Sequence, residues 1–413
     1  MSRSVHRSGR SIKSALAASG VAALLAVAAC SSSGGGSSPS GTGAAAGGGS
    51  GGLPATIDIG VPLDLTGSSE ITGVGTGEQA GVQFAISQIN SSHFLGNTQI
   101  KGTFFDTQAS KTQAVARTIE LAQDKVTAIV GYTLTDSFLA AAPTAQKAGI
   151  PTMAVGLSGS GVTNVGDYMF RELLDYALLF KQGDPQFVKA TGGKTAAYLY
   201  GSDTVTTSGQ FKERQALLQS LGVKTVAVQS ITAASTDISA QLTAIKNANP
   251  AYVVVDVDTG QVPQVMSQIA SSGINAQVLG DNGLGTPQTL ASPTAAKGAQ
   301  CGLFAEPWYI GSTAGGNAQF VKDWEAANKG QQPDLFNALG HDAMWGMATA
   351  IKQANSTNGQ SIRTALANLK ANFSGALGAY KWASDGQPTY KVVTMQVNDG
   401  KAVVWTPAST CTR

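Results

Sequence analysis

The chain has 413 residues, of which 42% are hydrophobic and 13% charged, and its 27 Lys and Arg nearly balance 25 Asp and Glu. This balance excludes the basic surface that characterises nucleic-acid-binding proteins. The three histidines (His6, His93 and His341) and three cysteines form no cluster with the spacing of a zinc site. So few candidate bases also argue against an enzyme, and we expect no metal, no cofactor and no catalysis.

Residues 1–29 have the composition of a secretory signal peptide. Four basic residues and no acidic residue precede the apolar run 15–29, ALAASGVAALLAVAA. A basic start, a short apolar run and small residues at its end are typical of such a signal, whereas a membrane span needs about 20 apolar residues. Subtracting these four from the 27 Lys and Arg leaves 23 against 25 Asp and Glu, so the mature chain is nearly neutral.

Cys30 directly follows Val27-Ala28-Ala29, and the four residues resemble a bacterial lipobox, whose cysteine is lipid-modified and becomes the first mature residue. The alternative is an ordinary cleavage site with a chance cysteine. Residues 31–52 contain only Gly, Ser, Ala, Thr and Pro, so they bury too little apolar surface to fold. We expect residues 30–53 to be a lipid-anchored, Gly/Ser-rich tether.

From residue 56 onward, short apolar runs alternate with segments of helical periodicity. Ser110 and Gln113 form a capping box, and the helix that it opens is predicted to turn Val115, Ile119 and Ala122 inward. The first block of the pattern predicts strands at 56–61, 100–105, 126–131 and 150–155, and helices at 77–90, from 110, and at 136–148.

The same pattern restarts after residue 190. It predicts strands at 195–200, 224–231, 251–257 and 277–280, and helices at 208–222, 237–250 and 262–273. Strands that alternate with helices form right-handed βαβ units and parallel sheets, so the fold class is α/β. Two such blocks predict two doubly wound lobes. Ligands bind beyond the carboxyl ends of such strands, which places the site in a cleft between the lobes.

Four stretches, in their order and spacing, carry a resemblance to a known family. They are IGVPLDLTG with GEQAGVQFAISQIN, VTAIVGYTLTDSFLAAAPTAQKAGIPTMAVG, ALGHDAMWGMATAI and GALGAYKWASDGQP. From about residue 54 to 413 the chain resembles the type I periplasmic solute-binding proteins of the leucine/isoleucine/valine-binding family. The resemblance implies two lobes joined by three crossings, with lobe 1 at 54–174 and 308–381 and lobe 2 at 175–307 and 382–413.

The family grips a ligand carboxylate with hydroxyls and backbone N–H groups after the third and fourth strands of lobe 1. The matching residues here are Thr133, Leu134, Thr135, Gly156, Leu157 and Ser158. Short hydroxyl donors and helix N-termini suit an anion, although ordinary βα loops also favour Ser, Thr and Gly. The first βα loop adds Ser68 and Ser69. The aromatic residues Tyr132, Tyr176 and Trp308 are expected to enclose apolar parts of the ligand.

The second lobe departs from the family pattern. Where the amino-acid binders have an acidic residue for the ligand ammonium, this chain has Asn282 beside Asp281, and a contacting tyrosine is replaced by Asp258. Either Asp258 and Asp281 rebuild the ammonium site or the ligand has no ammonium. We expect a small, carboxylate-bearing, amino-acid-like solute, but not a plain branched-chain amino acid as the best ligand.

Cys301 and Cys411 remain in the mature chain. In an exported protein such a pair predicts a disulfide, and the alternative is two buried thiols. The family resemblance implies an extracytoplasmic monomer, lipid-anchored to the cell membrane through Cys30, that closes on its solute by a hinge motion and delivers it to an ABC permease. The alternative is a ligand-sensing receptor of the same fold that signals to a partner.

Overall fold

The computed structural model describes residues 52–67 and 69–412, so the predicted signal peptide and Cys30 lie outside the described residues. Within them, no helix is both long and apolar enough to cross a membrane. The described chain forms two large sheets and one short hairpin of β11 (Phe373–Gly375) with β12 (Gly378–Tyr380).

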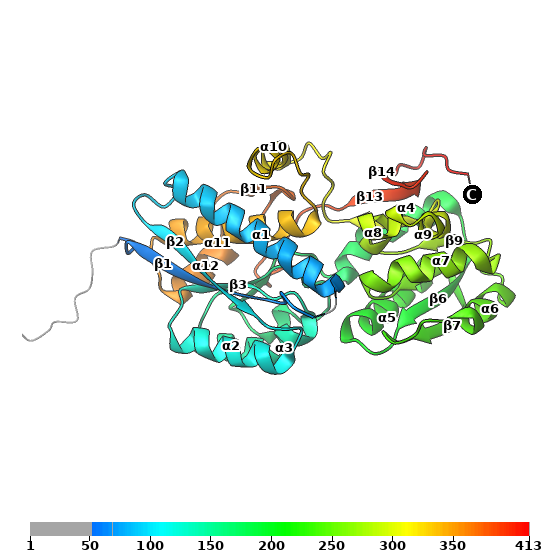
Figure 1. Ribbon diagram of the computed structural model, residues 1–413, viewed down its shortest axis with the longest axis horizontal. Helices are drawn as coiled ribbons and strands as arrows, with labels where there is room; N and C mark the ends of the chain where they lie inside the picture. Colours follow the sequence, from blue (N-terminus) through cyan, green and yellow to red (C-terminus); the bar gives the residue numbers. More distant parts are fainter. Residues whose placement is uncertain (1–51, 68, 413) are drawn as a thin grey trace, which may run out of the picture. The chain divides into compact units, whose positions relative to one another are not determined.

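The first sheet has five parallel strands in the order β2-β1-β3-β4-β5. Its strands are β1 (Thr56–Leu63), β2 (Gln99–Asp106), β3 (Ala128–Gly131), β4 (Thr152–Ala154) and β5 (Met169–Arg171). Its helices are α1 (Ser69–Ser91), α2 (Lys111–Gln123), α3 (Thr135–Ala148), α10 (Asn317–Ala327), α11 (Leu335–Ala354) and α12 (Gly359–Ala367). We call this sheet with these helices the first lobe; α1 packs on α11, and α2 packs on α3 (Figure 1).

The alternation of side chains along β1 separates two cores in the first lobe. Ile57, Ile59 and Val61 point into the core that includes α1 and α11. Gly60 points the other way, where a Cβ atom would lie 2.5 Å from a methyl carbon of Leu121 on α2. The missing side chain therefore lets α2 pack closely on the sheet.

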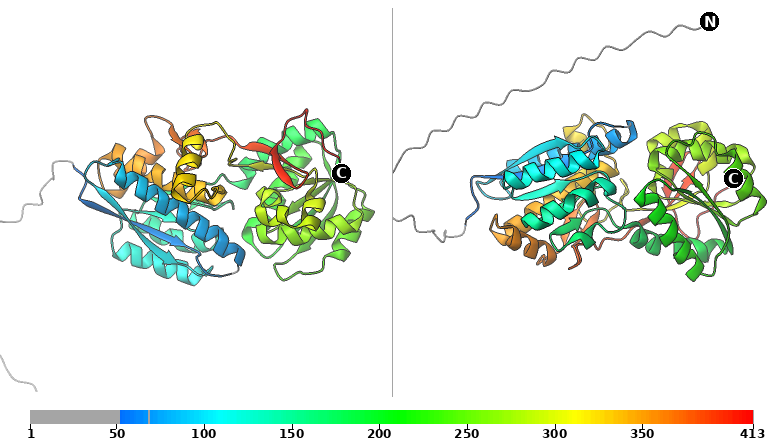
Figure 2. Two further views of the ribbon diagram at one scale, coloured as in Figure 1. Left: turned by 45° about the horizontal axis from the view of Figure 1, so that its top comes forward. Right: turned by 90° about the horizontal axis from the view of Figure 1, so that it is seen from below.

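The second sheet has seven strands in the order β14-β13-β10-β9-β8-β6-β7. The parallel strands are β6 (Thr195–Gly201), β7 (Lys224–Ile231), β8 (Tyr252–Asp256), β9 (Gln277–Leu279) and β10 (Leu303–Glu306), and the antiparallel edge is β13 (Val393–Asn398) with β14 (Lys401–Val404). Its helices are α4 (Tyr176–Thr191), α5 (Val205–Ser220), α6 (Ser239–Asn247), α7 (Val262–Ser272), α8 (Pro287–Ala291) and α9 (Pro293–Ala299). We call this sheet with these helices the second lobe (Figure 2).

The predicted α/β fold with two parallel-sheet lobes is confirmed. The chain passes between the lobes three times: after β5, after β10 and between β12 and β13. The antiparallel edge β13–β14 was not predicted. It brings chain from the far C-terminal region beside β10, which is visible as the strands coloured red in Figure 1.

The inward face predicted for α2 is correct in part: Val115 and Ala122 are half-buried against the core, but the centre of the buried face is one position earlier. Ala114, Thr118 and Leu121 are buried, whereas Ile119 is 43% exposed. Thr118 tolerates burial because its hydroxyl is 2.7 Å from both the Ala114 carbonyl oxygen and the Tyr132 hydroxyl. Hydrophobic periodicity cannot show such a pairing, since it counts threonine as polar.

Candidate ligand-binding site

The loop after β3 leads directly into α3, so its residues lie at a helix N-terminus. Leu134 precedes the helix and Thr135 begins it. The Thr135 hydroxyl accepts a hydrogen bond of 3.2 Å from the Gly159 N–H, which belongs to the loop after β4. The two predicted anion-binding loops are therefore held side by side at the carboxyl edge of the first sheet.

The hydroxyl of Thr133 already has two hydrogen-bond partners within the protein. Its hydroxyl donates to Glu78 Oε2 at 2.7 Å and accepts from the Asp64 N–H at 3.1 Å. Burial raises the pKa of Glu78 well above its ordinary value. A Cβ atom on residue 156 would lie 1.9 Å from Glu78 Oε1, so any larger residue at Gly156 would force this carboxyl group to move.

Arg171 at the end of β5 fastens the loop after β4 to the first crossing between the lobes. Its buried guanidinium donates to the carbonyl oxygens of Leu157, Gly159 (3.0 Å) and Leu173 (2.7 Å), and to the Asp175 carboxylate at 3.1 Å. Burial lowers the pKa of Arg171 to about 10, still high enough to keep its charge at neutral pH. Leu157 itself is buried and offers only its backbone to this site.

These bonds also orient the loop's N–H groups. In a trans peptide unit the C=O and N–H point in opposite directions, and the described chain has no cis peptide. Because the carbonyls of Leu157 and Gly159 point at Arg171, the N–H groups of Ser158 and Ser160 point away from it. Neither of these N–H groups donates to another described residue. The loop therefore presents donors suited to an anion.

Tyr176, the first residue of α4, connects the two lobes. Its N–H donates to the Ser158 carbonyl oxygen at 3.0 Å. Its hydroxyl lies 3.5 Å from Asp281 Oδ2 and 3.4 Å from Asn282 Oδ1, and also hydrogen-bonds with the side chains of Ser158 and Gln210. Burial raises the pKa of Tyr176, so its hydroxyl stays protonated and acts as a donor.

Helix α5 provides further contact between the lobes. The Ser160 hydroxyl of the first lobe donates to Glu213 Oε1 at 2.6 Å. A Cβ atom on Gly159 would lie 3.0 Å from the Thr206 hydroxyl oxygen. Thr206, Gln210 and Glu213 are spaced to share one face of α5, so Gln210 lies between these two contacts.

Asp281 and Asn282 follow β9 at the carboxyl edge of the second sheet. Asp281 is 2% exposed and its carboxylate accepts the Gly283 N–H at 2.9 Å. Burial raises the pKa of Asp281 to about 6 despite this bond and the charge of Arg214. Keeping the buried Asp281 carboxyl group charged at neutral pH therefore costs free energy.

Asp258 and Glu306 bring two more carboxyl groups to this edge, after β8 and at the end of β10. Burial, followed by the charges of Asp203 and Asp136, raises the pKa of Asp258. Burial and then the charge of Asp281 raise the pKa of Glu306. The second-lobe wall is therefore acidic.

Two predicted aromatic contacts lie in the core instead. The Tyr132 ring is buried against Phe138, at 5.2 Å between ring centroids, and its hydroxyl meets Thr118. Trp308 is 7% exposed, and its Nε1–H donates to Asn317 Oδ1 at 2.7 Å. Both polar groups are satisfied internally, so neither ring is placed to enclose a ligand.

Ser68 and Cys30 lie outside the described residues, and Ser69 is described only as the start of α1. Cys301 and Cys411 form a disulfide with their Cα atoms 5.6 Å apart. This bond joins the start of β10 to the C-terminal segment.

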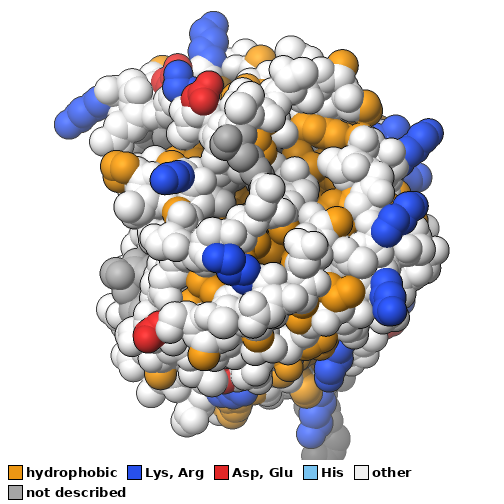
Figure 3. Space-filling view, turned by 90° about the vertical axis from the view of Figure 1, so that its right-hand side faces the viewer, with side chains coloured by type: hydrophobic (Ala, Val, Ile, Leu, Met, Phe, Trp, Pro, Cys, Tyr) orange, Lys and Arg blue, Asp and Glu red, His pale blue; other side chains and the backbone are white. Residues whose placement is uncertain are grey.

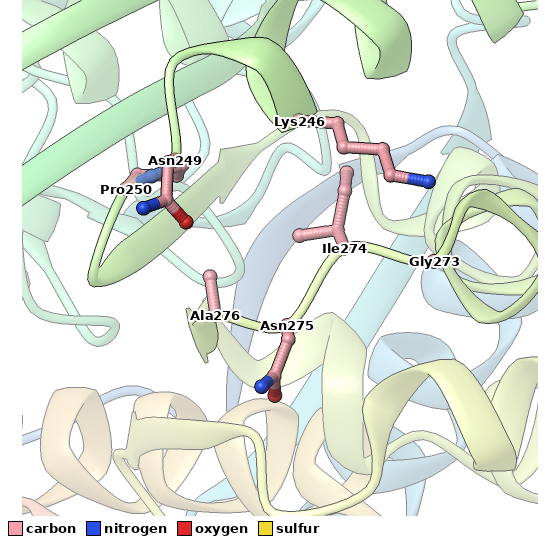
Figure 4. A pocket seen from close by; sticks show the side chains of 7 residues that line it. All are labelled: Lys246, Asn249, Pro250, Gly273, Ile274, Asn275 and Ala276. Atoms are coloured by element: carbon pink, nitrogen blue, oxygen red, sulfur yellow. The ribbon is translucent and has the colours of Figure 1, made fainter.

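One surface hollow lies at the opposite edge of the second sheet. Lys246, Asn249, Pro250 and residues 273–276 line it, and Figure 4 shows them around the chain just before β8 and β9. The Lys246 ammonium donates a hydrogen bond of 2.9 Å to the Ser272 carbonyl oxygen. Figure 3, which views that end of the molecule, shows apolar side chains in shallow hollows and basic side chains toward the rim. Because Asp258 and Asp281 follow the same strands, this hollow is separate from the candidate site.

Sequence reasoning missed Glu78, Arg171, Gln210 and Glu213. A signal existed for Arg171, because Arg171 and Glu172 together interrupt the apolar run YMFRELL. A charged residue in a buried segment is almost always paired, so its position indicated a network. Gln210 and Glu213 gave no comparable signal, since polar residues on a helix usually face water.

This arrangement is that of a two-lobed α/β protein whose candidate site lies where the loops of the two lobes meet. A family model described as periplasmic binding protein matches residues 56–402. The leucine-, isoleucine-, valine-, threonine- and alanine-binding protein of Pseudomonas aeruginosa is 23% identical over 358 residues, covering 81% of this chain and 92% of that protein. The chain therefore belongs to the periplasmic binding protein family, and its role is to bind a solute.

Solved structures agree with this assignment. The branched-chain amino acid transporter substrate-binding protein LivJ from Streptococcus pneumoniae, in complex with isoleucine, is 25% identical with a TM-score of 0.74, covering 84% of this chain and 97% of that one. A solute-binding protein of an ABC transporter from Rhodopseudomonas palustris, in complex with 3,4-dihydroxybenzoic acid, is 20% identical with a TM-score of 0.73, covering 84% of this chain and 95% of that one.

Proposed function

We propose that this protein is an extracytoplasmic lipoprotein that captures a small, carboxylate-bearing, amino-acid-like solute between its lobes and delivers it to an ABC permease. The observation that carries the proposal is the position of Tyr176. It contacts the donor-rich loop after β4 through Ser158 and the acidic edge of the second sheet through Asp281. A zwitterion would place its carboxylate on the first side and its ammonium on the second.

The relatives support a transported solute but differ in its chemistry. The Pseudomonas protein is named for five amino acids, whereas the Rhodopseudomonas structure holds an aromatic acid. A carboxylate is common to all of these ligands. The acidic second wall of this chain favours the amino-acid-like alternative, because an aromatic acid brings no positive charge to it.

Binding to ligand-stripped protein tests the proposal. Protein unfolded in denaturant, dialysed and refolded should gain thermal stability with at least one amino acid or small organic acid, since a ligand at 100 times its Kd stabilises by about 2.7 kcal/mol. Ser158→Ala and Thr135→Ala should each weaken that binding, whereas Thr243→Ala on exposed α6 should not. Unchanged affinity in both site variants would contradict the first-lobe assignment.

The anchor has its own test. Replacing Cys30 with Ala should release the protein from membranes or block its processing, while Ser31→Ala should leave fractionation unchanged. Membrane association of the Cys30→Ala variant with no change in lipid mass would refute the anchor. Solute uptake in vesicles containing the candidate permease would separate a transport role from that of a sensor.

A further inference from the structure

The second-lobe wall carries more carboxyl groups than one ligand ammonium needs. Asp258, Asp281 and Glu306 stand at the carboxyl ends of the adjacent strands β8, β9 and β10. No described Lys or Arg forms an ion pair with any of the three. The nearby Arg214 is saturated, because it binds Asp184 and Asp256 with three of its nitrogens.

The three carboxyl groups repel one another. The charge of Asp258 acts on Asp281, and the charge of Asp281 acts on Glu306. The Tyr176 hydroxyl approaches Asp281, but only at 3.5 Å, which is long for a hydrogen bond. Burial and the neighbouring carboxyl groups favour the protonated forms of these side chains, whereas a cationic ligand placed between the lobes would favour their charged forms and gain an ion pair.

An independent observation points to a donor-bearing ligand. Gln210 is 3% exposed, and its Oε1 has no hydrogen-bond partner. The same side chain hydrogen-bonds with the Tyr176 hydroxyl, on the face of α5 that meets the first lobe. An orphaned amide oxygen beside the acidic wall lacks an N–H or O–H donor, and a ligand can supply it.

A metal ion does not fit as the missing cation. Among the described residues, no group of three or more His, Cys, Asp or Glu side chains is placed to hold one. The carboxyl groups are spread over three strands, so they suit an extended organic cation with several N–H donors. A single ammonium would meet one of them and leave the other two carboxyl groups without an ionic partner.

We propose that the ligand carries a second cationic group besides its α-ammonium, as an amino acid with an amine or guanidinium side chain does. This inference rests on the proposed function, since the first lobe is assigned the ligand carboxylate. The two cationic groups meet Asp258, Asp281 and Glu306, and a ligand N–H satisfies Gln210 Oε1.

Calorimetry with matched ligand pairs tests this inference on stripped, refolded protein. Arginine is compared with citrulline, which keeps its length, and lysine with norleucine, which keeps its carbon chain; each neutral partner lacks one positive charge. The charged member should bind about 10- to 100-fold more tightly, the range for a hydrogen bond between charged groups. Glu306→Gln should reduce that preference about tenfold or more. Asp399→Asn, the same charge change at the exposed turn between β13 and β14, should leave it intact.

Each other outcome counts against the inference. Equal affinity within both pairs overturns it. Binding of leucine or 3,4-dihydroxybenzoate without binding of arginine or lysine overturns it while the solute-binding function stands. No binding by any amino acid or organic acid tested removes the proposed function together with the inference.

Discussion

The two walls of the candidate site differ in the groups that they present: one offers hydrogen-bond donors and the other offers carboxyl groups. The first-lobe wall presents the N–H groups of Ser158 and Ser160, whose orientation depends on a buried arginine that binds carbonyl oxygens. The second-lobe wall presents carboxyl groups, and its buried Arg214 is neutralised by Asp184 and Asp256. One arginine therefore orients N–H donors toward the candidate site, whereas the other forms its ion pairs with Asp184 and Asp256 and with none of the carboxyl groups of the acidic edge. Under the proposed function, this contrast fixes the orientation of the ligand.

Removing Arg214 is expected to have a large effect on the stability of the second lobe. Although burial opposes its charge, Asp184 and Asp256 raise the pKa of Arg214, so it is charged at all relevant pH values. Arg214→Met would leave two buried carboxylates unpaired and should lower the free energy of unfolding by about 3–5 kcal/mol. Chemical denaturation measures this. A loss under about 1 kcal/mol would show that the pair network contributes little to the second lobe.

Removing Arg171 should disturb the other wall. Arg171→Met leaves the carbonyls of Leu157, Gly159 and Leu173 without their donor, and each buried unsatisfied group costs about 1–3 kcal/mol. We expect reduced stability together with faster amide hydrogen exchange in residues 157–160. Arg171→Lys should recover part of the stability but not the exchange protection, because one ammonium cannot reach all three carbonyls. If amide hydrogen exchange in residues 157–160 is unchanged in Arg171→Met, the arginine does not hold this loop in place.

Asp281→Asn should act in the opposite direction on stability. Because burial raises the folded-state pKa of Asp281 to about 6 from 3.8, its favourable contribution is present below about pH 4 and lost as pH rises through 6. The asparagine variant should therefore be more stable at pH 7.5, by about 2–3 kcal/mol, and its advantage should disappear near pH 4. The Gly283 N–H keeps its acceptor, since asparagine retains one oxygen.

The same variant should bind the ligand more weakly, so that stability and function change in opposite directions. Thermal unfolding at the two pH values, with and without ligand, measures both effects. Lower stability at pH 7.5 with unchanged ligand affinity would mean that the second wall is structural.

Sequence reasoning reached the fold because the fold depends on repeated, local signals. Alternating apolar runs and helical segments predicted the parallel strands from β1 to β4 and from β6 to β9. The short strands β5 and β10 and the antiparallel pair β13–β14 were missed. Strand β5 has only three residues, too few to show a period, and β10 pairs with β13 from a distant part of the chain, as in the register of Phe304 with Met395.

The site was less accessible to sequence reasoning because side-chain direction depends on tertiary packing. Tyr132 was placed in a binding loop, but its ring turns into the core because Thr118 offers its hydroxyl a partner there. Thr133 lies where the family resemblance places a hydroxyl donor, yet Glu78 occupies that donor. Tyr176, Asp281 and Asn282 were predicted, and the structure brings these three together.

The most direct test of the account is a crystal structure of the protein purified with the ligand it carries. The account predicts one small molecule beside the Tyr176 hydroxyl. Its carboxylate should meet the N–H groups of Ser158 and Ser160, and its positive charge should face Asp281 and Glu306. A ligand bound in the hollow beside Asn249 and Asn275, or one whose carboxylate faces the second lobe, would contradict the account.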